Sequence, residues 1–188
     1  MAELRDWQGM NAMMGRLLRE RTGEDLETWN TRIESLNFTD EAGLRAWLTA
    51  QDVTGYAQTL LLMEQFGYPD FMLASADDLI EEQYADRPQL KPVFEALIGA
   101  AASLGEVAIQ ARKTYVSLVT PRRTFARIQP TTRERIDLGL RIDGQEPGGR
   151  LKPSKIQETM RLQIGLSSLE EIDAEVLGWL QIAYDSNR

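Results

Sequence analysis

Basic and aromatic side chains carry most of the chemistry that this sequence offers, because it contains no histidine and no cysteine. Imidazole and thiolate catalysis, disulfide bonds and the usual kinds of zinc site are therefore excluded. Cations are concentrated between residues 110 and 161, where 12 Lys and Arg stand against 5 Asp and Glu. Guanidinium groups bind phosphate and carboxylate through paired hydrogen bonds, so this segment predicts an anion-binding site.

Alternation of apolar and polar residues predicts which of these cations share a surface. Residues 136–142 and 160–166 alternate strictly, which is typical of strands with one buried side. If the apolar side of the sheet faces helices, the polar side collects the basic residues, and a glycine-rich loop adds two more. The predicted ligand-binding residues are Lys113, Tyr115, Arg127, Arg135, Arg141 and Arg161 on the sheet, with Arg150 and Lys152 on the loop.

Phe125 does not fit this simple alternation, because it falls on the same side as Arg127. Either the aromatic ring is exposed there, or a β-bulge shifts the strand. The arginines can also be explained without a ligand. Arginine is common on the solvent-exposed face of an antiparallel sheet, where it keeps the protein soluble.

The interleaving of Tyr115 and Phe125 with arginines is typical of surfaces that bind single-stranded nucleic acid. The net charge of the chain is −8, however, and residues 1–90 hold 7 basic against 17 acidic side chains. That acidic half would repel a long polyanion, so duplex nucleic acid is not an expected partner. A small anionic ligand or a nucleotide fits the charge pattern better.

Catalytic constellations are sparse. General acid–base chemistry would have to come from Asp, Glu, Lys or Tyr, and Asp137 between two arginines is typical of an ion pair. Glu106, Lys113 and Asp137 could form a magnesium-dependent nuclease site, but no spacing supports it. Residues 148–150 lack the spacing of a phosphate loop and indicate a turn. No catalytic residue, metal or cofactor is expected.

The elements that must position these residues divide the chain in two. Up to residue 86 the apolar residues recur at helical spacing and predict five helices, the third capped by Asp40 and the fifth starting near Ser75. A helix through residues 90–104 comes next. Strands are predicted over residues 113–119, 124–129, 136–142 and 160–166, and residues 107–111 form either a fifth strand or the start of the first. Residues 143–153 read as a loop, and Ser167 or Ser168 should cap a final helix.

The predicted fold class is therefore α+β. An all-helical domain over residues 1–86 precedes an 87–188 domain built as helix, four- or five-stranded antiparallel sheet and helix, with both helices on one face. No secretory signal and no bilayer-spanning apolar stretch is evident. A cytoplasmic location without a membrane partner is expected.

Two sets of motifs resemble bacterial domains of unknown function. The first resembles a small helical domain and consists of TGEDLETW at 22–29, WL at 47–48 and VTGYAQ at 53–58. The second resembles a domain loosely labelled a predicted transport protein and sometimes attached to nuclease domains; it consists of KTYVS at 113–117, FA at 125–126, DLGL at 137–140, SSLEEID at 167–173 and AYD at 183–185. The resemblance implies a bacterial protein with two domains in this order and assigns no catalytic residue.

Two other functions remain open at this point. The acidic helical domain could dock a protein partner or a second copy of the chain, which would make the protein a scaffold or a homo-oligomer. A carboxylate- or metal-dependent enzyme would require acidic side chains to cluster in a cleft.

Overall fold

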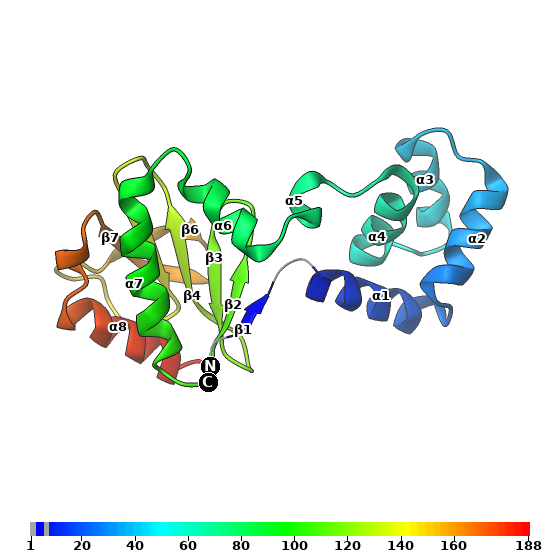
Figure 1. The fold of residues 1–188 in the computed structure, drawn as a ribbon. Coiled ribbons are helices and arrows are strands. Elements are labelled where there is room, and N and C mark those ends of the chain that lie inside the picture. The colour runs from blue at the N-terminus through cyan, green and yellow to red at the C-terminus, as the bar shows by residue number, and fades with distance from the viewer. Residues whose placement is uncertain (1–2, 6–7) are drawn as a thin grey trace. The chain divides into compact units, whose positions relative to one another are not determined.

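The computed structural model describes residues 3–5 and 8–188, and it confirms the α+β class (Figure 1). The chain forms two compact units. One consists of Trp7–Ala74, and the other of Ser75–Arg188 together with the strand at the start of the chain. The units therefore divide ahead of the boundary expected at residue 86.

The first unit is helical, with α4 at its centre in contact with α1, α2 and α3. Carboxylates start two of its helices: Asp25 accepts a hydrogen bond from the backbone N–H of Thr28, and Asp40, as predicted, from that of Gly43. The short α5 was not predicted. The helices are α1 (Gln8–Thr22), α2 (Leu26–Leu36), α3 (Glu41–Ala50), α4 (Gly55–Phe66) and α5 (Asp70–Leu73).

The second unit is a seven-stranded sheet in the order β1-β2-β3-β4-β5-β7-β6. The pairing of β1 with β2 is parallel and every other pairing is antiparallel. The sheet has more strands than expected, because β1 lies in a segment without alternation and β6 begins inside the predicted loop. The strands are β1 (Glu3–Arg5), β2 (Ala108–Ala111), β3 (Val116–Val119), β4 (Thr124–Pro130), β5 (Ile136–Leu140), β6 (Lys152–Gln157) and β7 (Met160–Leu166).

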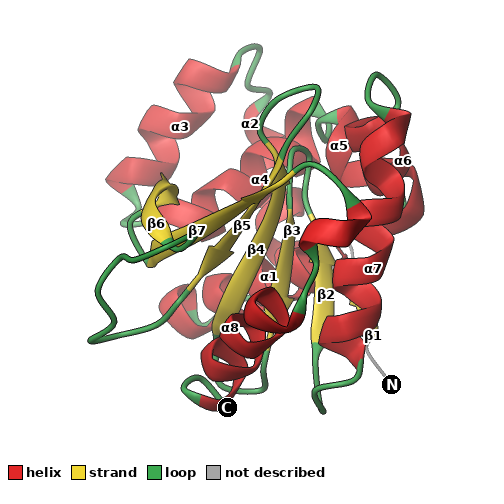
Figure 2. Ribbon diagram, turned by 90° about the vertical axis from the view of Figure 1, so that its left-hand side faces the viewer, coloured by secondary structure: helices red, strands yellow, loops and turns green. Residues whose placement is uncertain are grey.

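Helices cover one face of this sheet, as the sequence predicted (Figure 2). Phe94 and Leu97 of α7 and Val176 and Leu180 of α8 join the helix-facing strand residues in one apolar core. Tyr84 of α6 belongs to the same core, which explains why residues 75–86 group with the sheet. The helical elements of this unit are α6 (Ala76–Tyr84), η1 (Pro88–Leu90), α7 (Lys91–Ala102), η2 (Leu169–Glu171) and α8 (Ala174–Asp185).

A β-bulge accommodates Phe125. Leu118 pairs with Ala126, but the next residue of β3, Val119, pairs with Thr124. The extra residue turns its ring into the core, where it is fully buried and packs edge-on against Tyr184 at 5.5 Å between ring centroids. Of the two explanations left open by the sequence, the bulge is the correct one.

The final helix begins later than predicted. The N-cap of α8 is Asp173, whose side chain accepts a hydrogen bond from the backbone N–H of Val176. Ser167 and Ser168 instead lead into the single turn η2, and the Glu171 carboxylate accepts from the Ser167 N–H at 2.6 Å. The residues with capping-box spacing thus begin the short turn η2 and not the final helix. Within residues 3–5 and 8–188, no helix has the length and apolar character needed to cross a membrane.

Gly105, in the connection from α7 to β2, should not tolerate a side chain. Its φ is 149°, and a Cβ there would lie 3.2 Å from Tyr184 Cζ and still closer to the hydroxyl. We expect Gly105→Ala to lower the free energy of unfolding in urea by about 1–3 kcal/mol. Gly99→Ala, at an exposed position of α7 with open space around it, should raise it by about 0.5–1 kcal/mol. Equal effects of the two variants would contradict this account.

Candidate anion-binding site

Strand pairing aligns one cross-strand row on the side of the sheet that faces away from α7 and α8. Leu118, Ile128 and Leu138 are fully buried on the helix side of the sheet. Successive side chains of a strand point to opposite sides, so the residues next to these three in the sequence point away from the helices. The row runs across five strands through Ser117, Arg127, Gly139, Gln163 and Lys152. We call this side the open face. The structure thus places two of the predicted residues, Arg127 and Lys152, in one row.

Arg127 is the best-defined cation of the open face. Its Cζ lies 3.2 Å from the centroid of the Tyr115 ring, and its Nη1 donates to Gln157 Oε1 at 3.3 Å. Its Nε is buried without a hydrogen-bond partner. Burial lowers the pKa of the guanidinium, and Tyr115 opposes this with a smaller effect. No described carboxylate pairs with Arg127, so its charge is partly desolvated and uncompensated.

Tyr115 and Lys113 lie in a turn and not in a strand. The strand predicted over residues 113–119 begins only at Val116, and residues 112–115 form the turn from β2, closed by the Arg112 N–H on the Tyr115 carbonyl at 2.9 Å. Tyr115 therefore lies beside Arg127 at the edge of the row. Lys113 lines a separate hollow, together with residues of α6.

The end of the β6–β7 hairpin covers the centre of the row. A Cβ on Gly139 would lie 3.1 Å from Ile156 Cδ1 and 3.3 Å from Met160 Cβ. The register of β6 on β7 shifts between Pro153 and Gln157, which lets this end of the hairpin bend over the face. The cationic side is therefore not the continuous surface that alternation predicts. The glycine in the middle of an alternating strand was the only sequence signal of this close approach.

Arg135 is engaged by an acidic neighbour. Asp137 is 3% exposed and accepts hydrogen bonds from Thr131 Oγ1 at 2.6 Å and from Arg135 Nη2 at 3.3 Å, and Arg135 Nε lies 3.0 Å from its other oxygen. Of the two arginines that flank Asp137 in the sequence, Arg135 forms the ion pair with it. The pair balances the charge of Arg135 within the protein.

Arg150 anchors the loop before β6 to the start of α8. It donates to Asp173 Oδ2 and to the Glu171 carbonyl, both at 2.7 Å, and it lies 3.9 Å from Glu175. The structure does not bring it to Arg127. Arg141 and Arg161 continue the open face by alternation, on the far side of Gly139 from the Tyr115 turn.

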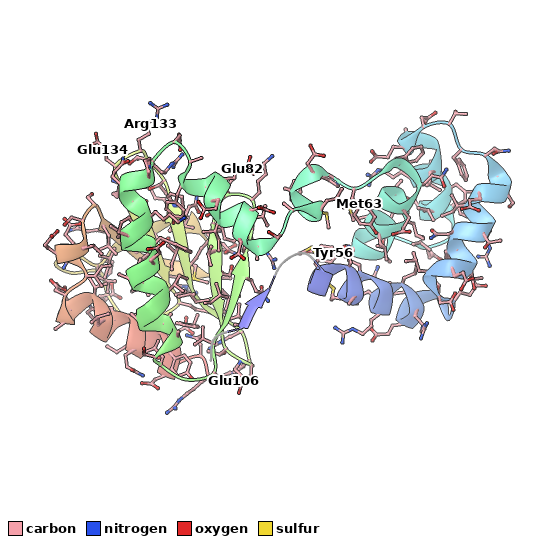
Figure 3. The ribbon with its side chains drawn as sticks, in the orientation of Figure 1. Tyr56, Met63, Glu82, Glu106, Arg133 and Glu134 are labelled. Atoms are coloured by element: carbon pink, nitrogen blue, oxygen red, sulfur yellow. The ribbon has the colours of Figure 1, made fainter. Side chains whose placement is uncertain are left out.

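The residues considered for a metal-dependent nuclease site are not brought together in the described part of the chain. Glu106 precedes β2 and Lys113 follows it, so the posed nuclease set is not assembled; Figure 3 shows Glu106 at the opposite end of the sheet from the β4–β5 loop with Arg133 and Glu134. Over the described ranges, no cluster of three or more acidic side chains could hold a metal ion.

The cap of α8 should make stability depend on pH. The Val176 N–H, and to a lesser extent Arg150, hold the pKa of Asp173 below its usual value of 3.8. A carboxyl with a lowered folded-state pKa stabilises the fold above its unfolded-state pKa, and this contribution is lost as pH falls through the folded value. We expect Asp173→Ala to lower Tm at pH 7 and to match the wild type in strong acid. Asp143→Ala, at an exposed loop position, is the control and should change Tm at neither pH.

A family model described as a domain of unknown function, DUF5655, matches residues 80–187 of the chain. The match begins within α6 and ends just after α8, so it spans the sheet from β2 onward and the helices that cover it. No curated protein and no solved structure matches the chain.

Proposed function

The chain belongs to the DUF5655 family, whose domain has no assigned function, and from this premise we propose that the domain is a non-catalytic binding module for a small anion or nucleotide. The ligand binds on the open face, where Arg127 is its anchor and the Tyr115 ring its neighbour. Arg141, Arg161 and Lys152 supply further positive potential on the same side of the sheet.

One observation carries the proposal: Arg127 is half-buried and has no carboxylate partner among the described residues. A desolvated charge is costly unless an opposite charge compensates it. Two other arginines of the predicted set, Arg135 and Arg150, have such partners. Arg127 differs from them, and an anionic oxygen beside its guanidinium would provide the missing charge.

The hairpin limits the size of the ligand. Since Ile156 and Met160 stand over Gly139, an extended polyanion cannot lie flat along the whole row. A single phosphate or carboxylate group needs to reach only Arg127, so the hairpin excludes it less strictly. The acidic net charge of the chain, −8, also disfavours a long polyanion.

We also propose that residues 22–58 belong to the small helical bacterial domain that they resemble, and that the protein acts in the cytoplasm. The helical unit of Trp7–Ala74 and the TGEDLETW motif support the first statement.

Binding can be tested by thermal shift and titration calorimetry with phosphate, pyrophosphate, citrate and adenine nucleotides at millimolar concentration. At least one of these should raise Tm, because a ligand that binds only the folded state stabilises it. Arg127→Gln should weaken that binding by about tenfold or more, as expected for loss of a charge-assisted hydrogen bond. Added salt should weaken it as well.

Arg122→Gln is the matched control, because Arg122 is exposed in the β3–β4 turn, away from the row. It removes the same charge and should leave the affinity unchanged. If no anion raises Tm, or if Arg127→Gln binds as well as the wild type, the proposed function is wrong. Circular dichroism of each variant ensures that a loss of binding is not a loss of fold.

A further inference from the structure

The edge of the sheet at β2 is covered by a short strand from the start of the sequence. This strand, β1, has three residues and is the only one that pairs in parallel within the described sheet (Figure 1). More than half of the chain separates β1 from β2, including the compact unit Trp7–Ala74. The match to the family domain begins at residue 80 and does not include β1. The paired positions are Glu3 with Ala108, Leu4 with Ile109 and Arg5 with Gln110.

The two edges of the sheet differ in how they are protected against a further strand. At the other edge, β6 carries Lys152, Pro153 and Lys155, and its register on β7 shifts after Pro153. Charged residues, prolines and bulges are the features by which proteins protect a sheet edge from unwanted pairing. β2 has none of them, since its sequence is AIQA and its pairing with β3 is regular over all four residues. The β2 edge therefore needs a covering strand, and β1 supplies it.

A second copy of the chain presents the same strand. Its β1 would form the same three pairs with β2, because the strand and the edge are identical in both copies. The sheet from β2 onward and the unit Trp7–Ala74 have separate apolar cores, so an exchange of β1 leaves both cores intact. Parallel pairing over only three residues also holds a strand less firmly than a longer antiparallel ladder does.

We propose that β2 is the acceptor edge for β1 of a second copy, so that two chains exchange their first strands and form a dimer. Each sheet then consists of β2–β7 of one chain and β1 of the other. The exchange does not depend on the proposed anion binding, but it bears on that site. Arg5 pairs with Gln110, which pairs with Ser117 of the Arg127 row, so the exchanged strand extends the row by a basic residue of the second copy.

Disulfide trapping tests the exchange, because the chain has no cysteine and only engineered positions can form a disulfide. Paired residues of neighbouring strands lie within the Cα–Cα range of a disulfide, roughly 4.4–6.8 Å. Chains with Glu3→Cys and isotopically labelled chains with Ala108→Cys are mixed in urea, refolded together and oxidised. A disulfide between positions 3 and 108 then necessarily joins two chains. We expect mass spectrometry to find it in a fraction that grows from micromolar to millimolar protein.

Two other acceptor positions control for random collision. Gln110→Cys lies two residues further along β2, out of register with position 3, and Lys155→Cys is at an exposed position of the other edge strand. Each should form the disulfide with Glu3→Cys at least about tenfold less often than Ala108→Cys, because a disulfide tolerates little displacement.

Leu4→Pro together with Arg5→Pro tests whether strand pairing is responsible. Neighbouring residues of a strand direct their N–H groups to opposite edges, so one of the two prolines removes a donor that faces β2. Added to Glu3→Cys, the two prolines should lower the yield of the disulfide with Ala108→Cys at least about tenfold. Leu4→Val together with Arg5→Lys keeps both donors and should leave the yield unchanged. Circular dichroism of each variant shows that the fold is retained.

The proposal is wrong if Ala108→Cys forms the disulfide no more often than Lys155→Cys, or if the two prolines leave its yield unchanged. It is also wrong if Glu3→Cys and Ala108→Cys, placed in one chain, give only the disulfide within that chain at millimolar concentration. None of these measurements involves an anion, so their outcome is independent of the binding tests on Arg127.

Discussion

Burial of one side of the sheet beneath α7 and α8 is the constraint on which the rest of the second unit depends. A slip of one residue in any strand would exchange its apolar and polar sides, and the buried side forbids this. The orientation of Arg127, Ser117 and Gln163 thus follows from the burial of Ile128, Leu118 and Ile164. The bulge at Phe125 preserves this arrangement, because it adds a residue to β4 and keeps the aromatic ring in the core.

The open face is shaped by a different interaction, the bend of the β6–β7 hairpin. Gly139 lets Ile156 and Met160 approach the middle of β5, and Gln157 from the same hairpin reaches Arg127. The hairpin thereby covers part of the polar side of the sheet. Arg135 and Arg150 each form an ion pair with a carboxylate of the protein, so their charges are balanced within the fold.

Arg127 and Gln83 each have a buried polar side-chain atom without a hydrogen-bond partner among the described residues. At Arg127 the missing partner is a negative charge, and at Gln83 Oε1 it is a hydrogen-bond donor. Most buried polar atoms in folded proteins are paired, so such exceptions point to ligands or water.

Local patterns in the sequence determined the α+β class, the helix starts at Asp40 and Ser75, and the side of the sheet on which Arg127 lies, because helix caps and strand alternation depend on neighbouring residues. The sequence could not show that Asp173 caps α8, that β1 pairs with β2, or that α6 packs with the sheet, since these depend on contacts between distant segments. The same holds for the sites. Alternation predicted the side of the sheet on which Arg127 lies. Its stacking on Tyr115 and the hairpin over Gly139 were decided only when the tertiary structure brought separate elements together.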